Sequence, residues 1–200
     1  MVFLPNDITR SSIAQKAVEQ AISDEGQIFI GWRDVPTDDT VLGKSVINNK
    51  PIIKQFFIQR SSKCIDENHF QRKLYVIRKT VHKKIHKSNL LEWEDFYIVS
   101  LSTRTIVFKG MVLAPNLSKF YVDFQDTKFE TAIALFHQRF STNTFPSWRL
   151  AQPFRYLCHN GEINTVKGNI NWMNSRKHSM KSETLGKDLD KLLSLIHISE

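Results

Sequence analysis

Five apolar residues constrain the fold of this chain more than any other feature. Phe70, Leu74, Ile77, Val81 and Ile85 recur at steps of four, three, four and four, which is the spacing of one helix face. The spacing predicts a long helix from about residue 70. Its continuous apolar stripe must be buried against another element of a folded domain.

The same segment carries most of the positive charge of the chain. The formal net charge is +8, and residues 60–87 contain nine basic and two acidic side chains. We interpret the basic residues as the side of this helix that faces water. The alternative is a non-catalytic module that binds nucleic acid or an acidic partner. It is disfavoured because the aromatic residues that interleave with basic ones in single-strand binders are missing.

Other patterns predict a mixture of helices and strands. A first helix is expected behind Ser11 or Ser12 as its cap, with Gly26 ending it. Strands are expected at residues 27–32 and 52–59, and a short turn or helix at residues 116–119. This mixture predicts one mixed α/β or α+β domain.

Three further elements are expected in the second half of the chain. Two apolar-rich runs at residues 95–102 and 105–114 predict a hairpin. Residues 131–140, TAIALFHQRF, predict a buried strand whose polar end faces a cleft. A helix is expected at residues 163–180.

The bulk composition limits the class of protein. With 200 residues and 41% hydrophobic content, the chain is large enough for one domain with its own core. No apolar run is long enough to cross a membrane, and the first residues lack the features of a secretory signal. Cys64 and Cys158 have neither zinc-site nor disulfide spacing, so we expect a cytoplasmic protein.

Arg139 is the first candidate for substrate binding. A guanidinium at the end of a strand can hold a carboxylate through two parallel hydrogen bonds, and Thr142 and Asn143 follow closely enough to complete its shell. An arginine paired with an acidic core residue or with backbone carbonyls explains the sequence equally well.

Asn160 and Gly161 form the second candidate. An amide side chain and an unhindered backbone N–H can together stabilise an oxyanion, although an ordinary Asn-Gly turn is favoured when the pair is considered alone. Cys158 is interpreted as a small buried apolar residue, because adjacent side chains in an extended segment point to opposite faces and His159 therefore cannot serve it as a base. Cys64 has neither a histidine nor an oxyanion donor near it in sequence. We expect no metal site, since His137, His159 and His178 lack a recognisable ligand spacing.

A longer stretch carries a family resemblance. FHQRFSTNTFPSWRLAQPFRYLCHNGEINTVKGNINWMNSR resembles the signature region of the glutamine amidotransferase domain of the glutamate synthase large subunit. GWRDVP, FQRKLYVIRK, SLSTRTIVFKGM and DLDKLL are also similar to this family, so the resemblance covers about residues 1–193. It implies an α+β fold of the N-terminal nucleophile hydrolase type, an αββα sandwich that this chain contains incompletely at both ends.

The resemblance also implies roles for the candidate residues. Arg139 corresponds to the arginine that holds the α-carboxylate of L-glutamine, with Thr142 and Asn143 nearby, and Asn160 and Gly161 correspond to the oxyanion hole. The nucleophile of the family is a cysteine that begins the mature chain. Since MVFLP resembles an internal stretch, we expect the nucleophile upstream and this piece to be inactive.

Further expectations concern the rest of such an enzyme. No cofactor is expected in this piece, whereas the family implies flavin mononucleotide (FMN) and an iron–sulfur cluster in the full-length protein, together with ferredoxin or a small subunit as partner. Neither nucleic acid nor membrane is expected as a partner, and a plastid location applies if the source is a photosynthetic eukaryote. Residues 194–200, SLIHISE, resemble a translated sequencing adaptor and are expected to be a non-native tail, with a genuine amphipathic tail as the alternative.

Overall fold

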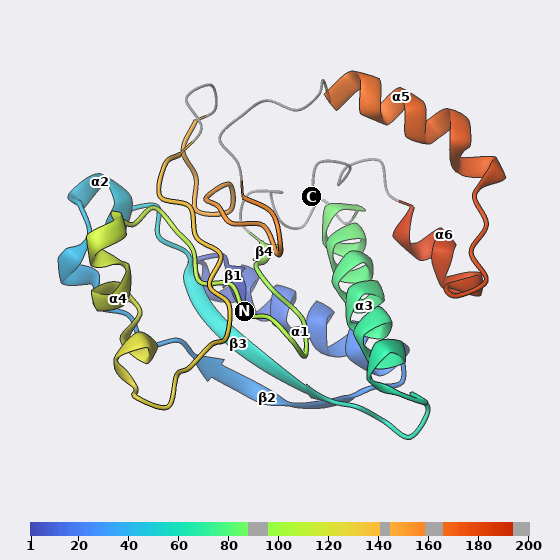
Figure 1. Ribbon diagram of the computed structural model, residues 1–200, viewed down its shortest axis with the longest axis horizontal. Coiled ribbons are helices and arrows are strands. Elements are labelled where there is room, and N and C mark those ends of the chain that lie inside the picture. Colours follow the sequence, from blue (N-terminus) through green and yellow to red (C-terminus); the bar gives the residue numbers. More distant parts are fainter. Residues whose placement is uncertain (88–95, 141–144, 159–165, 194–200) are drawn as a thin grey trace.

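A four-stranded antiparallel sheet lies at the centre of the structure (Figure 1), a computed structural model that describes residues 1–87, 96–140, 145–158 and 166–193. The strand order is β2-β3-β1-β4, and all three pairings are antiparallel. The strands are β1 (Val2–Leu4), β2 (Ile28–Asp34), β3 (Ile52–Gln59) and β4 (Tyr97–Ile98). The strands predicted around residues 27–32 and 52–59 are therefore confirmed.

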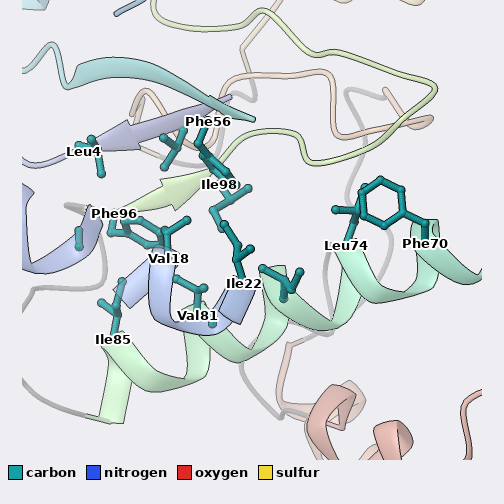
Figure 2. Packing of buried hydrophobic residues seen from close by; sticks show 14 of the residues in the cluster. Leu4, Val18, Ile22, Phe56, Phe70, Leu74, Val81, Ile85, Phe96 and Ile98 are labelled. Atoms are coloured by element: carbon teal, nitrogen blue, oxygen red, sulfur yellow. The ribbon is translucent and has the colours of Figure 1, made fainter. Parts of the chain in front are cut away.

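Two long helices cover one face of this sheet (Figure 2). They are α1 (Ile8–Asp24) and α3 (Glu67–Lys87). All five residues of the predicted α3 stripe are buried, and they pack against α1 residues such as Val18 and Ile22 and against sheet residues such as Phe56. The helical spacing in the sequence thus marks the side of α3 that contacts the rest of the core.

The ends of α1 were predicted with mixed success. The cap is Asp7, whose side chain accepts a hydrogen bond of 2.7 Å from the Arg10 N–H, so the expected cap at Ser11 or Ser12 is wrong. The first turn was missed because its apolar residue, Ile8, faces solvent and adds nothing to the buried stripe. Gly26 follows the helix with a φ of +68°, as a glycine that ends a helix does.

The opposite face of the sheet is covered by loops and short helices. Its core contains Phe3 and Ile53 from the sheet, packed against Phe108, Tyr121 and Trp148 from the covering segments. The short elements are η1 (Asp39–Val41), α2 (Lys44–Ile47), η3 (Ala114–Asn116), α4 (Leu117–Phe120) and η4 (Val122–Gln125). The helical turn expected at residues 116–119 is confirmed.

Two predicted strands are wrong. Only Tyr97–Ile98 of the expected hairpin forms a strand, and residues 105–113 contain neither strand nor helix. Residues 131–140 also lack regular structure, and Ile133 and Phe136 are 84% and 81% exposed. Apolar composition suggested burial, but a strand also needs a neighbouring strand to accept its backbone hydrogen bonds, and the described part of the chain provides none there. The fold is a mixed α+β arrangement with one sheet in the described ranges.

The last described segment returns to the helical layer. It contains α5 (Val166–Arg176), η5 (Lys177–Ser179), η6 (Gly186–Asp188) and α6 (Leu189–Leu192). The helix predicted at residues 163–180 is confirmed in α5, while residues 163–165 lie outside the described residues.

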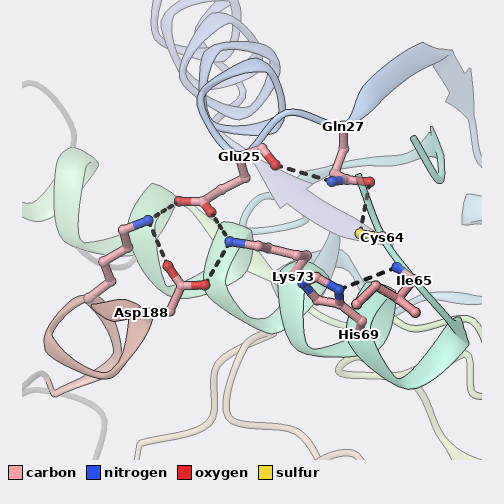
Figure 3. A network of polar contacts seen from close by, with 8 residues as sticks. Glu25, Gln27, Cys64, Ile65, His69, Lys73 and Asp188 are labelled. Atoms are coloured by element: carbon pink, nitrogen blue, oxygen red, sulfur yellow. Dashed lines mark hydrogen bonds and ion pairs between the residues drawn. The ribbon is translucent and has the colours of Figure 1, made fainter. Parts of the chain in front are cut away.

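Four charged side chains join this segment to the helices (Figure 3). The Lys73 ammonium lies 2.9 Å from a Glu25 carboxylate oxygen and 2.6 Å from one of Asp188, and Lys191 lies 2.7 Å from Glu25. The Glu25 side chain is only 5% exposed. Burial alone would raise the pKa of Asp188, but hydrogen bonds from Lys73 and Lys191 outweigh it and hold that pKa below its usual value.

The basic residues of α3 do not all face water. Arg78 and Lys79 are 5% and 6% exposed, so the expectation of a fully solvated basic face is wrong for both. Arg78 lies over the Tyr97 ring and Lys79 over the Tyr75 ring, at 5.9 and 5.8 Å from the ring centres. Aromatic rings accept such cations inside a core. In the described residues, no helix is both long and apolar enough to cross a membrane.

Candidate functional site

Arg139 lines a cavity on the loop-covered side of the sheet. The cavity has a volume of about 580 Å³ and is bounded by three stretches, residues 41–46, 110–113 and 137–140, together with part of the segment that follows Phe145. Its lining is mostly apolar, with Val46, Met111 and Leu113 among the contributors. The polar side chains among the lining residues are those of His137, Gln138, Arg139 and Gln152. A mostly apolar hollow with a few polar side chains is typical of a small-molecule site.

His137 lines this cavity and carries an unpartnered ring nitrogen. Its Nδ1 is buried and makes no hydrogen bond in the described structure, whereas most buried polar atoms have a partner. Sequence reasoning considered His137 only as a metal ligand and as the polar end of a strand. The sequence did contain one indication that His137 lies at the same site as Arg139: the two residues are two positions apart, and such side chains share a face in an extended segment.

Cys158 brings a second segment close to the first. Its Sγ lies 3.6 Å from the backbone oxygen of Phe136, three residues before Arg139. The side chain is half-buried, so the expectation of a buried apolar residue holds only in part. Cys158 therefore lies beside the segment that carries Arg139.

Four of the five predicted site residues lie outside the described residues. They are Thr142, Asn143, Asn160 and Gly161. Arg139 is described, and it is exposed at the cavity rim rather than at the end of a buried strand. The expected grouping of Arg139 with Thr142 and Asn143 stays a prediction, because both residues lie outside the described ranges.

The loop after Phe145 is attached to the segment at residues 107–112 by several contacts. The Nζ of Lys109 donates a hydrogen bond of 2.7 Å to the Arg149 carbonyl. The Trp148 ring lies so close to Gly110 that a Cβ placed there would be 2.3 Å from the indole. The Tyr121 hydroxyl donates a 2.7 Å hydrogen bond to the Lys109 carbonyl, and burial raises the pKa of Tyr121 strongly. These contacts fix two walls of the cavity relative to each other.

The other cysteine lies in the opposite layer. Cys64 is buried beneath α1 and α3, with its Sγ 3.6 Å from the side-chain oxygen of Gln27 (Figure 3). This position is among the apolar contacts of the helical core and away from the residues that line the cavity. Among the described residues, no three His, Cys, Asp or Glu side chains gather closely enough to hold a metal ion, and His159 lies outside them.

Comparison with known proteins decides which family contains these features. The profile of the class-II glutamine amidotransferases matches residues 1–200. The chain belongs to this family.

Individual relatives point to one branch of class-II glutamine amidotransferases. The chain is 44% identical over 197 residues to the glutamate synthase [NADPH] large chain of Bacillus subtilis (strain 168), covering 98% of this chain and 13% of that protein. It is 41% identical over 198 residues to the corresponding large chain of Azospirillum brasilense, again covering 98% and 13%. The chloroplastic/mitochondrial ferredoxin-dependent glutamate synthase 1 of Arabidopsis thaliana is 41% identical over 183 residues, which are 91% of this chain and 11% of that protein.

These matches confirm the resemblance to the amidotransferase domain of glutamate synthase large chains. The chain spans about 13% of the length of the bacterial relatives.

Proposed function

We propose that this chain forms the glutamine-binding part of the amidotransferase domain of a glutamate synthase. The complete domain releases ammonia from L-glutamine, and the complete enzyme adds it to 2-oxoglutarate with two electrons from a nicotinamide or ferredoxin, which makes glutamate. One observation carries the proposal: Arg139 lines the rim of a mostly apolar cavity, and Cys158, two residues before Asn160 in the sequence, contacts Phe136 in the segment that carries Arg139.

The roles of the residues follow from what each group can bind. We assign the α-carboxylate of glutamine to Arg139, because a guanidinium offers two parallel donors in the geometry of a carboxylate. Thr142 and Asn143 complete that end of the site. Asn160 and Gly161 stabilise the oxyanion that forms when the side-chain amide is attacked, an effect of roughly 3–4 kcal/mol for each donor.

Neither cysteine of this chain is proposed as the nucleophile. Cys64 is buried in the helical core with Gln27 as its partner, and Cys158 is directed at the Phe136 carbonyl. A nucleophilic thiol needs a base and access to the substrate. We therefore propose that the nucleophile belongs to the remainder of the domain and that this chain does not turn glutamine over by itself.

The rest of such an enzyme is part of the same proposal. The second sheet of the αββα sandwich, the remaining domains, and a small subunit or ferredoxin would complete it, in the cytoplasm or in a plastid. FMN and an iron–sulfur cluster are proposed for the other domains. The residues present do not fit such a cluster, because its usual four thiolates exceed the two cysteines of this chain.

Calorimetric titration with L-glutamine tests the proposal. We expect weak but saturable binding to the unmodified chain and loss of that binding in Arg139→Met, because the carboxylate loses its counterion. Arg60→Met is the matched control, since Arg60 is exposed directly after β3 and lines no part of the cavity. Equal affinity of the unmodified chain and Arg139→Met would contradict the assignment. Glutamate release that disappears in Cys158→Ala would contradict the statement about the nucleophile.

A further inference from the structure

Lys109 occupies an unusual position for a lysine. Its side chain is only 2% exposed, within a run of apolar residues. Besides its hydrogen bond to the Arg149 carbonyl, the Nζ lies 4.1 Å from the ring centre of Phe154 and 4.5 Å from that of Tyr97. Lysine is almost never fully buried unless its amine has partners. The contacts of the Lys109 amine therefore indicate what the side chain does at this position.

The contacts of Lys109 connect two separate walls of the cavity. The residues that follow it, Gly110 and Met111, line one wall. The loop that it contacts through Arg149 and Phe154 supplies another, at Ala151 and Gln152. The lysine side chain therefore bridges the two stretches of backbone between which the cavity opens.

The surrounding contacts fix the bridge in one geometry. The Tyr121 hydroxyl holds the Lys109 carbonyl, so the backbone of the first wall cannot move freely. The Trp148 ring rests on Gly110, so the second wall cannot move closer. The hydrogen bond from Lys109 acts in the other direction and prevents the loop from moving away.

We propose that Lys109 is a positioning residue for the glutamine site: by holding the 147–154 loop against the 110–113 segment, it sets the width of the cavity that Arg139 lines. The identity of the ligand rests on the function proposed above, whereas the connection between the two walls rests on the contacts of Lys109 alone. Lys109 does not touch the substrate in this proposal, and its effect on binding passes through the loop.

The test uses Lys109→Met, which keeps the length of the side chain but removes its donor. Amide hydrogen exchange should accelerate about tenfold in the 147–154 loop, while α1 and α3 keep their protection; L-glutamine affinity should fall about tenfold, the equivalent of one hydrogen bond from a charged donor. Lys119→Met is the matched control, because Lys119 is exposed on α4 and lines no part of the cavity. It should change neither quantity.

A second variant covers the case in which Lys109→Met does not fold. Phe154→Leu removes one aromatic contact of Nζ and leaves the hydrogen bond, so it should show the same changes in the same direction but smaller. Unchanged loop exchange in a folded variant would overturn the proposal. So would faster loop exchange with unchanged glutamine affinity, which is the result of a purely structural role.

A different result is expected if the proposed function is wrong. If neither the unmodified chain nor Arg139→Met binds L-glutamine, the assigned ligand is wrong, and loop exchange alone decides whether Lys109 connects the cavity walls. Acceleration in Lys109→Met then supports the connection, and its absence overturns it.

Discussion

The two faces of the sheet are stabilised in different ways. On the helical face, apolar side chains from α1 and α3 form a continuous cluster with the strands, and each helix repeats its contacts every turn. On the cavity face, irregular segments pack in a second apolar cluster, and individual contacts, such as that of Trp148 with Gly110 and the hydrogen bond of Lys109, set the position of the 147–154 loop. The helices of the first face repeat their contacts, whereas the position of this loop depends on a few specific residues.

This difference explains where the candidate site lies. Loops on a rigid scaffold can place polar groups that a continuous apolar interface would exclude. Arg139 and His137 belong to an irregular segment on the cavity face, and none of the residues lining that cavity comes from α1 or α3. We therefore expect core substitutions to affect stability most on the helical face, and substitutions around the loop to affect binding.

The largest effect is expected at the centre of the α3 stripe. Ile77 is fully buried, and Ile77→Ala should lower the free energy of unfolding by about 2–5 kcal/mol because it removes contacts and leaves a cavity. Urea denaturation measures this change. Ile133→Ala is the matched control on the cavity face; at 84% exposure it should stay within about 0.5 kcal/mol. Similar losses in both variants would remove the distinction between the faces.

A pH effect is expected at the amino group of Met1 in a chain produced with Met1 as its first residue. This group is buried and donates a 2.7 Å hydrogen bond to the Ser100 carbonyl. Burial, with a smaller contribution from the charge of Arg78, lowers its pKa from 8.0 to about 5. Between these values the unfolded chain binds a proton that the folded chain does not. Stability should therefore decrease as the pH falls from 8 to 5, by at most about 4 kcal/mol, and this contribution should not change below pH 5.

Direct titration of the Met1 amino group separates its contribution to stability from the contributions of other titrating groups. Nuclear magnetic resonance of a chain labelled at Met1 should show the amine titrating near pH 5. A midpoint near pH 8 would mean that the amino group is exposed and that the slope in stability has another origin.

A smaller loss of stability is expected at the contact between Gly110 and Trp148. Gly110→Ala places a methyl group 2.3 Å from the indole, so the loop must shift, at a cost of about 1–3 kcal/mol. Gly43→Ala is a suitable control, since no atom lies within 4 Å of a Cβ built there. Urea denaturation of both variants gives the comparison. If Gly110→Ala is as stable as Gly43→Ala, the loop adapts to the added methyl group without cost. The contact between Gly110 and Trp148 would then not fix the cavity walls.

The smallest effect is expected in the ion-pair network on the helical side. Asp188→Asn removes one carboxylate that Lys73 and Lys191 share, and should cost about 1 kcal/mol near neutral pH. Because the folded pKa of Asp188 is lowered, this contribution is present above pH 3.8 and is lost as the pH falls through the folded pKa. Asp190→Asn changes an exposed carboxylate two residues away. A loss of the same size in both variants would show that the network adds nothing specific.

The sequence predicted the helical face well because its signals are local. Every residue of the α3 stripe is buried, since helical spacing alone determines which side chains share a face. The segment at residues 131–140 was misjudged because strand formation depends on a partner that lies elsewhere in the chain. Lys109 was missed for a similar reason: a lysine in the apolar run TIVFKGMVLA is a signal of burial, but only the structure shows what its amine contacts.

The candidate site was predicted mainly by resemblance to a family. Spacing alone left Arg139 undecided between a ligand and an internal ion pair, and the structure places it at a cavity. His137 was not recognised, because an unsatisfied ring nitrogen is a property of the folded environment and not of the residue type. Asn160 and Gly161 stay a prediction.

One experiment tests the central claim that Arg139 and the Asn160-Gly161 corner bind the two ends of one glutamine. Amide resonances of the ¹⁵N-labelled chain can be followed during titration with L-glutamine, with D-glutamine as control. We predict that the signals of Gly161 and Gly110 shift together, with one binding constant, and that both shifts disappear in Arg139→Met. Shifts at Gly161 that persist in Arg139→Met, or shifts confined to the basic helix α3, would contradict the account.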